Sequence, residues 1–344
     1  MMDLRSDTVT RPCSKMREAM AQAEVGDDVL REDPTIQKLE EQAAMLTGKE
    51  AALFCPSGTF ANQLALFTWT KPGEEVYLNE NAHIIQHEAG ASAHISGAFL
   101  RPIPPQNHPW IEWEDIQSRI RPVRDQHFPI PALVCLENAL SDGTVQPIDS
   151  MKRIYEGARN QGLHIHTDGA RLFNAALALQ VSPKEIAACT DSLMFCLSKG
   201  LGAPVGSLLC GSQNFIDEAF YKRKIMGGAM RQAGILAAAG LVALEDGVQG
   251  LQKDHQKAQE LAQAFSAIPG IQVLTPQPQI NMVFLKLPKP SQGELFLRTL
   301  KDAGILTYPP ENDVFRFVLH RDVEEAPFHQ FLTQLPALMG KVLR

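Results

Sequence analysis

Short runs of β-branched and other apolar residues alternate with amphipathic or alanine-rich segments over the first two thirds of the chain. The apolar runs are "AALFC", "EEVYL", "ALVCLE", "LHIHTD" and "SLMFC". Longer segments with helical spacing lie between them, such as "TFANQLALFTWT" and "IDSMKRIYEGARNQG". This alternation predicts an α/β fold in which a mostly parallel sheet is sandwiched between helices.

The pattern changes near Gly234, where a long segment rich in alanine and leucine begins. It is followed by "QKAQELAQAFSA" and by the strand-like runs "NMVFLKL" and "DVFRFVLH". A chain of 344 residues also exceeds the usual size of one hydrophobic core. We therefore expect a large domain over residues 1–250, including an N-terminal arm, and a smaller α+β domain over residues 251–344.

Composition narrows the classes of partner. The formal net charge of -7 gives no electrostatic footprint for nucleic acid. The start "MMDLRSDTVTRP" lacks the apolar region of a signal peptide, and the longest apolar run, "GILAAAGLVAL", is too short to cross a bilayer. The six cysteines form no C-x-x-C pair, which favours reduced thiols. We expect a cytoplasmic protein that binds a small molecule, with no nucleic-acid and no membrane partner.

Polar residues follow four of the predicted strands. Ligands of open α/β sheets bind beyond the carboxyl ends of the strands, so these residues are candidates for a binding site. They are Ser57, Gly58 and Thr59 in "PSGT", His83 in "NAHIIQH", Asp168 in "DGAR" and Lys199 in "SLMFCLSKGLGAPVGS". We expect all of them at one edge of the sheet.

This combination suits pyridoxal phosphate (PLP). The cofactor needs a lysine amine for covalent attachment and a carboxylate that keeps its ring nitrogen protonated, which Lys199 and Asp168 would supply. The helix start at "PSGT" would bind the phosphate, although alone it is a plain helix cap. His83 could stack on the ring, although a lone histidine is more often a capping or core residue. The glycines after Lys199 miss the dinucleotide fingerprint by one residue, which disfavours a dehydrogenase.

Two arginines are candidates for binding an anion. Arg171 follows Asp168 closely, and Arg316 interrupts the apolar strand "DVFRFVLH". A buried guanidinium needs a partner, so either a substrate carboxylate or a salt bridge should satisfy Arg316, and the sequence leaves both open. His83 and His87 have i, i+4 spacing but lack the glutamate of the zinc motif H-E-x-x-H, so we expect no metal site.

Seven motifs resemble those of a known family, and they occur in its order. They are "DLRSDTVTRP", "VGDD", "PSGTFAN", "AHIIQHEAG", "HTDGARLFNAA", "CLSKGLGAPVGSLL" and "GGAMRQAGILAAAG". From Asp3 to about Gly250, and more loosely to the C-terminus, the chain is similar to the low-specificity L-threonine aldolases, PLP enzymes of fold type I. The resemblance implies cleavage of L-threonine, L-allo-threonine and related L-3-hydroxy amino acids to glycine and an aldehyde. It also implies a homotetramer, a dimer of dimers with active sites at the dimer interface.

The resemblance implies roles for individual residues. Lys199 would hold PLP, Asp168 would pair with the ring nitrogen, and His83 would stack on the ring. Further cofactor contacts would come from Ser57, Gly58, Thr59 and Arg171, and from Lys224 and Arg231 of a neighbouring subunit. The substrate carboxylate would be bound by Ser6, Arg171 and Arg316. The β-hydroxyl would be contacted by His83 or His127.

Two positions depart from the pattern that the family often shows. Leu30 in "VGDDVLREDPT" replaces a tyrosine, and His87 stands where phenylalanine or tyrosine is expected. Both would line the region around the substrate's β-substituent, so side-chain preference and threo/erythro selectivity stay open.

Two competing functions share this fold. A β-eliminating lyase acting on another amino acid would have the same cofactor site and differ in its products. A catalytically silent PLP-fold protein that serves only in binding would show damage at Lys199, Asp168 or the arginines. The sequence shows no such damage.

Overall fold

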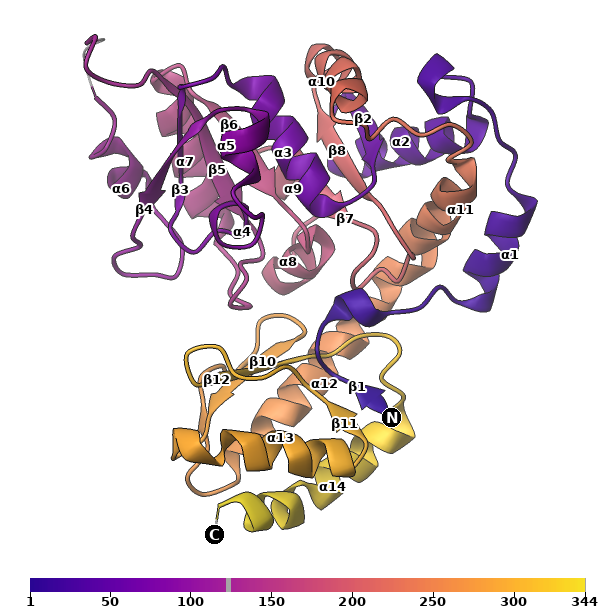
Figure 1. Ribbon diagram of the computed structural model, residues 1–344, viewed down its shortest axis with the longest axis vertical. Helices are drawn as coiled ribbons and strands as arrows, with labels where there is room; N and C mark the ends of the chain where they lie inside the picture. Colours follow the sequence, from indigo (N-terminus) through magenta and orange to yellow (C-terminus); the bar gives the residue numbers. More distant parts are fainter. Residues whose placement is uncertain (122–124, 344) are drawn as a thin grey trace.

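The structure, a computed structural model, describes residues 1–121 and 125–343. A larger α/β body and a smaller body are connected by a long helical segment (Figure 1). The large body centres on a seven-stranded sheet with the strand order β2-β8-β7-β6-β5-β3-β4. Its strands are β2 (Ala51–Cys55), β3 (Glu75–Asn79), β4 (Phe99–Ile103), β5 (Pro131–Glu137), β6 (His164–Asp168), β7 (Ser192–Cys196) and β8 (Ser207–Gly211). Only β8 runs antiparallel to its neighbours, so the predicted mostly parallel sheet is confirmed.

Helices cover this sheet, which explains the near-continuous apolar runs of its strands. Phe54, Leu193 and Phe195 are inaccessible to solvent because both faces of the sheet are packed. The helices of the large body are α2 (Pro34–Thr47), α3 (Gly58–Trp69), α4 (His83–Gln86), α5 (Ala91–Ile95), α6 (Trp113–Gln117), α7 (Ile148–Asn160), α8 (Leu172–Leu179), α9 (Pro183–Ala187) and α10 (Gln213–Ile225). The fold is therefore the α/β sandwich that the alternating pattern predicts.

The connecting segment joins α11 (Gly234–Val242) to α12 (Val248–Ser266) through a π-helical turn. By length and composition this 33-residue helix could cross a membrane, although the apolar run alone had indicated a segment too short to do so. However, 56% of its most apolar window is buried inside the protein. A Cβ on Gly240 would lie 2.9 Å from Leu39 Cδ2, so α11 packs closely against α2. A helix that is more than half buried and packs this closely against α2 is typical of the core of a protein.

The smaller body has its own apolar core. Its antiparallel sheet has the order β12-β10-β9, and the elements are β9 (Gln272–Val273), β10 (Met282–Lys286), β12 (Val314–Val318), α13 (Gly293–Asp302) and α14 (Glu325–Val342). The N-terminal strand β1 (Met2–Asp3) pairs in parallel with β11 (Ile305–Leu306), and Leu4 is buried in this core. Figure 1 accordingly shows the N-terminus beside the smaller body, before α1 (Ser14–Gln22) returns to α11. The division into residues 1–250 and 251–344 stays a prediction.

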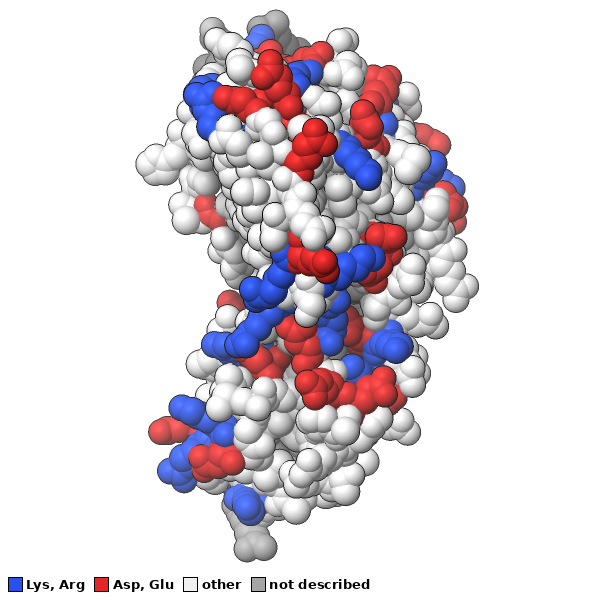
Figure 2. Space-filling view, turned by 90° about the vertical axis from the view of Figure 1, so that its right-hand side faces the viewer, with Lys and Arg blue, Asp and Glu red and all other residues white. Residues whose placement is uncertain are grey.

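Charges of both signs are interspersed over the face of the molecule shown in Figure 2. Blue and red side chains alternate across the narrow region between the two bodies. This mixture on that face accords with the formal net charge of -7.

Three parallel strands end side by side and define the functional edge of the large sheet. Glu137, the last residue of β5, is paired in register with Asp168, the last residue of β6. β7 lies on the other side of β6 and ends at Cys196, shortly before Lys199. Adjacent carboxyl ends therefore bring Asp168 and the Lys199 loop together, as the sequence predicted.

Candidate active site

A cavity of about 760 Å³ is formed by the large sheet, the N-terminal arm and the strand β12. Six of the residues selected from the sequence line it: Ser6, His83, His87, Arg171, Lys199 and Arg316. Segments from both ends of the chain thus contribute to one concave site. Such a cavity is large enough for a cofactor together with a small substrate.

Lys199 lies in a loop whose backbone is held at several points. Its carbonyl accepts hydrogen bonds from the backbone N–H of Gly202 (2.9 Å) and from the Thr10 hydroxyl (3.1 Å). Gly202 has a φ of +82°, and a Cβ there would lie 2.6 Å from Arg321 Cδ. Glycine is therefore required at this turn, and the N-terminal arm helps to fix the position of Lys199.

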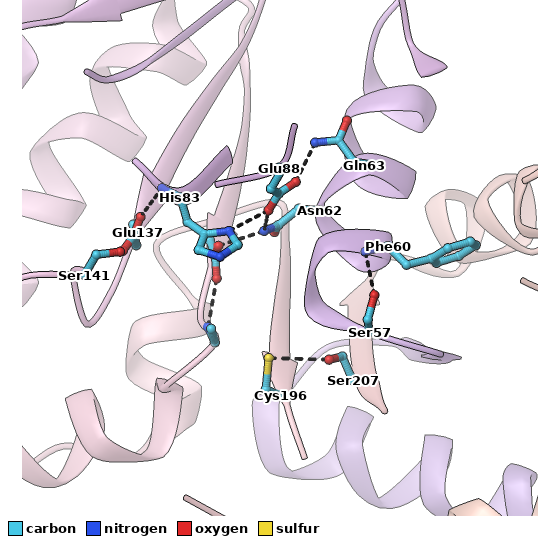
Figure 3. A network of polar contacts seen from close by, with 12 residues as sticks. Ser57, Phe60, Asn62, Gln63, His83, Glu88, Glu137, Ser141, Cys196 and Ser207 are labelled. Atoms are coloured by element: carbon cyan, nitrogen blue, oxygen red, sulfur yellow. Dashed lines mark hydrogen bonds and ion pairs between the residues drawn. The ribbon is translucent and has the colours of Figure 1, made fainter. Parts of the chain in front are cut away.

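Asp168 is buried and connected to His83 through two further side chains. Its Oδ1 accepts a hydrogen bond from the backbone N–H of Ala170 (2.9 Å), and its Oδ2 accepts one from Asn62 Nδ2 (2.7 Å). Asn62 Nδ2 also donates to Glu88 (2.9 Å), which faces His83 Nδ1 at 2.8 Å. Figure 3 shows Asn62, Glu88 and His83 pointing toward one another. One atom each of His83, Glu88 and Asp168 lie within 4.8 Å of one another. Because Asn62 already donates to both carboxylates, we expect no metal between them.

The segment Ser57–Thr59 starts helix α3. The Ser57 hydroxyl accepts a hydrogen bond from the backbone N–H of Phe60 (3.1 Å) and caps the helix. The N–H groups of Gly58 and Thr59 have no acceptor within the described part of the chain, so an anion can bind them. A Cβ on Gly58 would lie 2.8 Å from Cys196 Sγ, which explains why glycine stands there. The three residues do not line the cavity itself.

The two arginines of the cavity differ in their partners. Arg171 donates through Nε and Nη2 to the two carboxylate oxygens of Asp7, at 2.8 and 2.7 Å. Arg316 has no side-chain hydrogen bond or ion pair with any residue that the structure describes. Burial and the positive charge of Arg171 lower the pKa of Arg316. Arg316 is therefore the guanidinium in this cavity that still lacks an anion.

Comparison with known proteins identifies the chain. Residues 3–288 match the family described as beta-eliminating lyase. A probable low-specificity L-threonine aldolase 2 from Arabidopsis thaliana is 41% identical over 96% of this chain and 95% of the relative. A low specificity L-threonine aldolase from Escherichia coli (strain K12) is 42% identical over 99% of this chain and 100% of the relative. The chain belongs to the beta-eliminating lyase and threonine aldolase family.

A solved structure supports the fold. The threonine aldolase of Leishmania major has a TM-score of 0.83 to this chain, at 22% identity, and covers 99% of this chain and 100% of its own. The likeness shows fold type I of the PLP enzymes. This member of the beta-eliminating lyase and threonine aldolase family is accordingly a PLP-dependent lyase.

The chemistry of the site fits PLP. A lysine amine and a buried carboxylate lie at neighbouring strand ends, and α3 starts with the N–H groups of Gly58 and Thr59, which have no acceptor among the described residues. The ring nitrogen needs an anionic partner, and Asp168 is a carboxylate held in place by Asn62 and by the backbone of Ala170.

Eight residues selected from the sequence do not line the cavity of this lyase: Leu30, Ser57, Gly58, Thr59, His127, Asp168, Lys224 and Arg231. His127 is exposed, and its backbone N–H donates to Asp125 (2.8 Å). Leu30 is 63% exposed, Lys224 is exposed, and Arg231 forms an ion pair with Asp27 (2.7 Å). Within one chain these residues do not contribute to the lining of the cavity. Their assigned roles stay predictions.

Sequence reasoning did not select Glu137, although it lines the cavity. Its carboxylate accepts hydrogen bonds from the backbone N–H of His83 (2.8 Å) and from the Ser141 hydroxyl (2.6 Å). Burial and then the nearby charge of Asp168 raise the pKa of Glu137 to about 7. The sequence contained a signal for Glu137, because it ends an apolar run, "ALVCLE", in the way that Asp168 ends the next strand-like run.

The Asp7–Arg171 pair predicts a pH dependence of stability. Burial opposes ionisation of Asp7, but Arg171 outweighs it and lowers the pKa of Asp7 to about 2. Since this lies below the unfolded value, the pair stabilises the folded state above about pH 4 by roughly 2 kcal/mol, and this stabilisation is lost as the pH falls through about 2. We expect Asp7→Asn to lower the free energy of unfolding by at least that amount near neutral pH.

Chemical denaturation of the protein without PLP, near pH 7 and near pH 3, measures this effect. The difference between wild type and Asp7→Asn should shrink at the lower pH. Asp302→Asn on the surface of α13 is the matched control and should change neither value. Equal stability of Asp7→Asn and wild type near neutral pH would contradict the expectation.

Proposed function

We propose that this protein cleaves L-threonine, L-allo-threonine and related L-3-hydroxy amino acids to glycine and an aldehyde, with PLP as cofactor. The names of the relatives support the substrate class. The observation that carries the proposal is the unpaired Arg316 in a cavity that also contains Lys199 and His83. A PLP-dependent lyase acting on amino acids needs such a cation for the carboxylate of its substrate.

Arg316 would orient the substrate. A bidentate contact between its guanidinium and the carboxylate would fix the amino acid relative to Lys199 and Asp168. Arg171 donates Nε–H and one Nη2–H to Asp7, so its two Nη1–H bonds and its second Nη2–H would be the donors left for the substrate carboxylate. Ser6, which also lines the cavity, would complete the carboxylate site.

Cofactor binding would involve the residues that follow the strands. Lys199 would hold PLP, Asp168 would face the ring nitrogen, and Ser57, Gly58 and Thr59 would bind the phosphate. When bound, PLP supplies an electron sink for the pair released as the Cα–Cβ bond breaks.

His83 is the residue of this chain best placed to handle the proton of the β-hydroxyl. Its Nδ1 faces Glu88, so Nε2 is the nitrogen left to contact a hydroxyl, directly or through one water. Its backbone N–H is bound to Glu137, which limits movement of the ring's attachment point. His127 stays a second candidate, although it is exposed in this chain.

Assembly into a homotetramer, a dimer of dimers, would bring Lys224, Arg231 and Leu30 to the cavity of a neighbouring copy. The exposed apolar residues of α10 support such a contact, because Tyr221 is 70% and Ile225 is 63% exposed beside Lys224. Apolar side chains this exposed are typical of surfaces that other chains cover. We further propose that the enzyme works in the cytoplasm.

Product analysis tests the function. The PLP-loaded protein is incubated separately with L-threonine and L-allo-threonine, and the products are quantified. Glycine and acetaldehyde in equal amounts are the expected result. Ammonia with 2-oxobutyrate would instead mean elimination, which would keep the cofactor site and overturn the proposed cleavage.

His87 is expected to influence the selectivity between the two threonine epimers. It lines the cavity with its ring centroid 5.5 Å from that of His83, on the side where the β-substituent would lie. We expect His87→Phe to change the ratio of kcat/KM for L-threonine and L-allo-threonine by about 3-fold or more. The substitution would remove about one polar contact with the substrate, and a change of this size is expected for such a loss. PLP affinity should change less.

His94→Phe is the matched control, since His94 is exposed and lies outside the cavity. An unchanged ratio in His87→Phe would remove His87 from the substrate pocket.

A further inference from the structure

We propose that Asn62 and Glu88 are positioning residues that hold the imidazole of His83 and the carboxylate of Asp168 as one unit. Both residues lie outside the cavity lining and act through the residues they contact. This inference rests on the proposed function of the cavity, in which His83 and Asp168 contact cofactor and substrate. Its evidence is a hydrogen-bond network that runs from Asp168 through Asn62 and Glu88 to His83.

Asn62 occupies the centre of the network. Its Nδ2 donates one hydrogen to Asp168 Oδ2 (2.7 Å) and the other to Glu88 Oε1 (2.9 Å). Carboxylates only accept hydrogen bonds, so the amide nitrogen, rather than the oxygen, must face both of them. Two negative charges are buried close together here, and the shared amide offsets part of the cost.

A chain of buried groups fixes this orientation of the amide. Burial lowers the pKa of His166 to about 4, so its ring is neutral near pH 7 and carries one N–H. Trp69 Nε1 donates to the Ser192 hydroxyl (2.8 Å), and the hydrogen of that hydroxyl is free to be donated to His166 Nδ1 (2.9 Å). His166 Nε2–H then donates to Asn62 Oδ1 (3.2 Å). This arrangement satisfies each of these groups, whereas turning the amide of Asn62 over would set Oδ1 against the two carboxylates.

Glu88 connects the network to His83. It is 2% exposed and accepts from His83 Nδ1 (2.8 Å), Asn62 (2.9 Å) and Gln63 Nε2 (2.5 Å). The contact places a hydrogen on His83 Nδ1 and fixes the rotation of the ring about its Cβ–Cγ bond. Figure 3 shows Glu88 between the imidazole and the two amides.

Charged groups from several elements act on His83. The hydrogen bond to Glu88 raises the pKa of His83, and burial lowers it. The nearby charge of Asp168 also raises this pKa, whereas the charge of Lys199 lowers it. Glu137 accepts from its backbone N–H, and the ring of His87 lies 5.5 Å away. Because the hydrogen bond to Glu88 is the largest of these causes, replacing the Glu88 carboxylate should shift the titration of His83 most.

Two nearly isosteric substitutions should shift this titration in opposite directions. Glu88→Gln removes the charge that stabilises protonated His83, so we expect the titration midpoint of His83 to fall by about one pH unit or more. Asn62→Asp replaces the shared donor with a third carboxylate, so we expect the midpoint to rise. It should also raise the dissociation constant of PLP by about 10-fold or more near pH 8, because repulsion disturbs Asp168. A general loosening of the fold would not give shifts of opposite sign.

The titration is measured on the protein without PLP, from the rate at which diethylpyrocarbonate modifies His83 at each pH. Only the neutral imidazole reacts, and peptide mass mapping isolates the rate for His83. PLP affinity is measured by titrating the cofactor into the same protein. Neither measurement depends on the reaction catalysed, so a protein that released 2-oxobutyrate from threonine would still give these results.

Matched controls separate positioning from stability. Asn174→Asp makes the same change at a buried amide that contacts His255 and no carboxylate. Glu75→Gln removes a buried carboxylate that accepts from Tyr77 and Arg101, away from the cavity. Both controls should leave the His83 midpoint in place, even where they lower stability. Unchanged midpoints in folded Glu88→Gln and Asn62→Asp, or shifts of the same sign, would overturn the proposal.

Discussion

Lys199→Ala should abolish turnover while the protein stays folded and binds PLP weakly, without a covalent bond. The amine of Lys199 is the group of the cavity expected to hold the cofactor and to be displaced by the amine of the substrate. We expect kcat to fall by about four orders of magnitude or more, as when a nucleophile is removed from other covalent catalysts. Steady-state rates and the release of PLP on dialysis measure the two effects.

A matched control for this substitution is Lys253→Ala, at an exposed position of α12 outside the cavity. It should retain full activity and bound cofactor. Turnover by Lys199→Ala near the wild-type rate would contradict the assignment of the lysine, and with it the proposed cofactor geometry.

Arg316→Ala should lower kcat/KM for L-threonine by roughly 100-fold, mainly through KM. The guanidinium lies in the cavity without a partner among the described residues, so its loss removes a contact that only the substrate would make. A charge-assisted bidentate contact of this kind has an effect of that size on binding. Arg316→Lys should recover only part of the loss, because an ammonium group does not reproduce the planar fork.

Steady-state kinetics of Arg316→Ala, Arg316→Lys and the surface control Arg298→Ala measure this effect. Arg298 is exposed on α13 and does not line the cavity, so its removal should leave KM unchanged. If KM of Arg316→Ala equals that of the wild type, the arginine is not the carboxylate site.

The order of strands and helices was readable from the sequence because the buried sheet imposes a simple pattern. β5 and β7 are largely apolar, and polar residues stand at or shortly after the carboxyl ends of the buried strands: Glu137 ends β5, Asp168 ends β6, and Lys199 comes shortly after β7. Asp168 and Lys199 were selected on that ground, and adjacent strands bring them together. The α/β fold and the mostly parallel sheet are confirmed for the same reason.

Pairing between distant polar residues was not readable in this way. Asp7 and Arg171 are far apart in the sequence, and only the fold shows that they pair with each other and that Arg316 has no partner among the described residues. This contact distinguishes the surroundings of the two arginines, which the sequence could not do, and their roles toward the substrate stay predictions.

Asn62 and Glu88 belong to quoted motifs, yet their roles could not be assigned from spacing alone. Helical periodicity places Asn62 on the buried face of α3, where an amide looks unfavourable until its partners are known. Those partners come from β6 and from the loop after α4. Residues expected from a neighbouring copy, such as Lys224, depend on an assembly that one chain does not contain.

Borohydride reduction of the PLP-loaded protein, followed by proteolysis and peptide mass mapping, tests the central claim most directly. Reduction fixes the cofactor to the lysine that holds it. The expected result is one modified peptide, which contains Lys199, and its loss in Lys199→Ala. Modification of a different lysine, or of none, would show that PLP is not held at the end of β7 and would contradict the proposed active site.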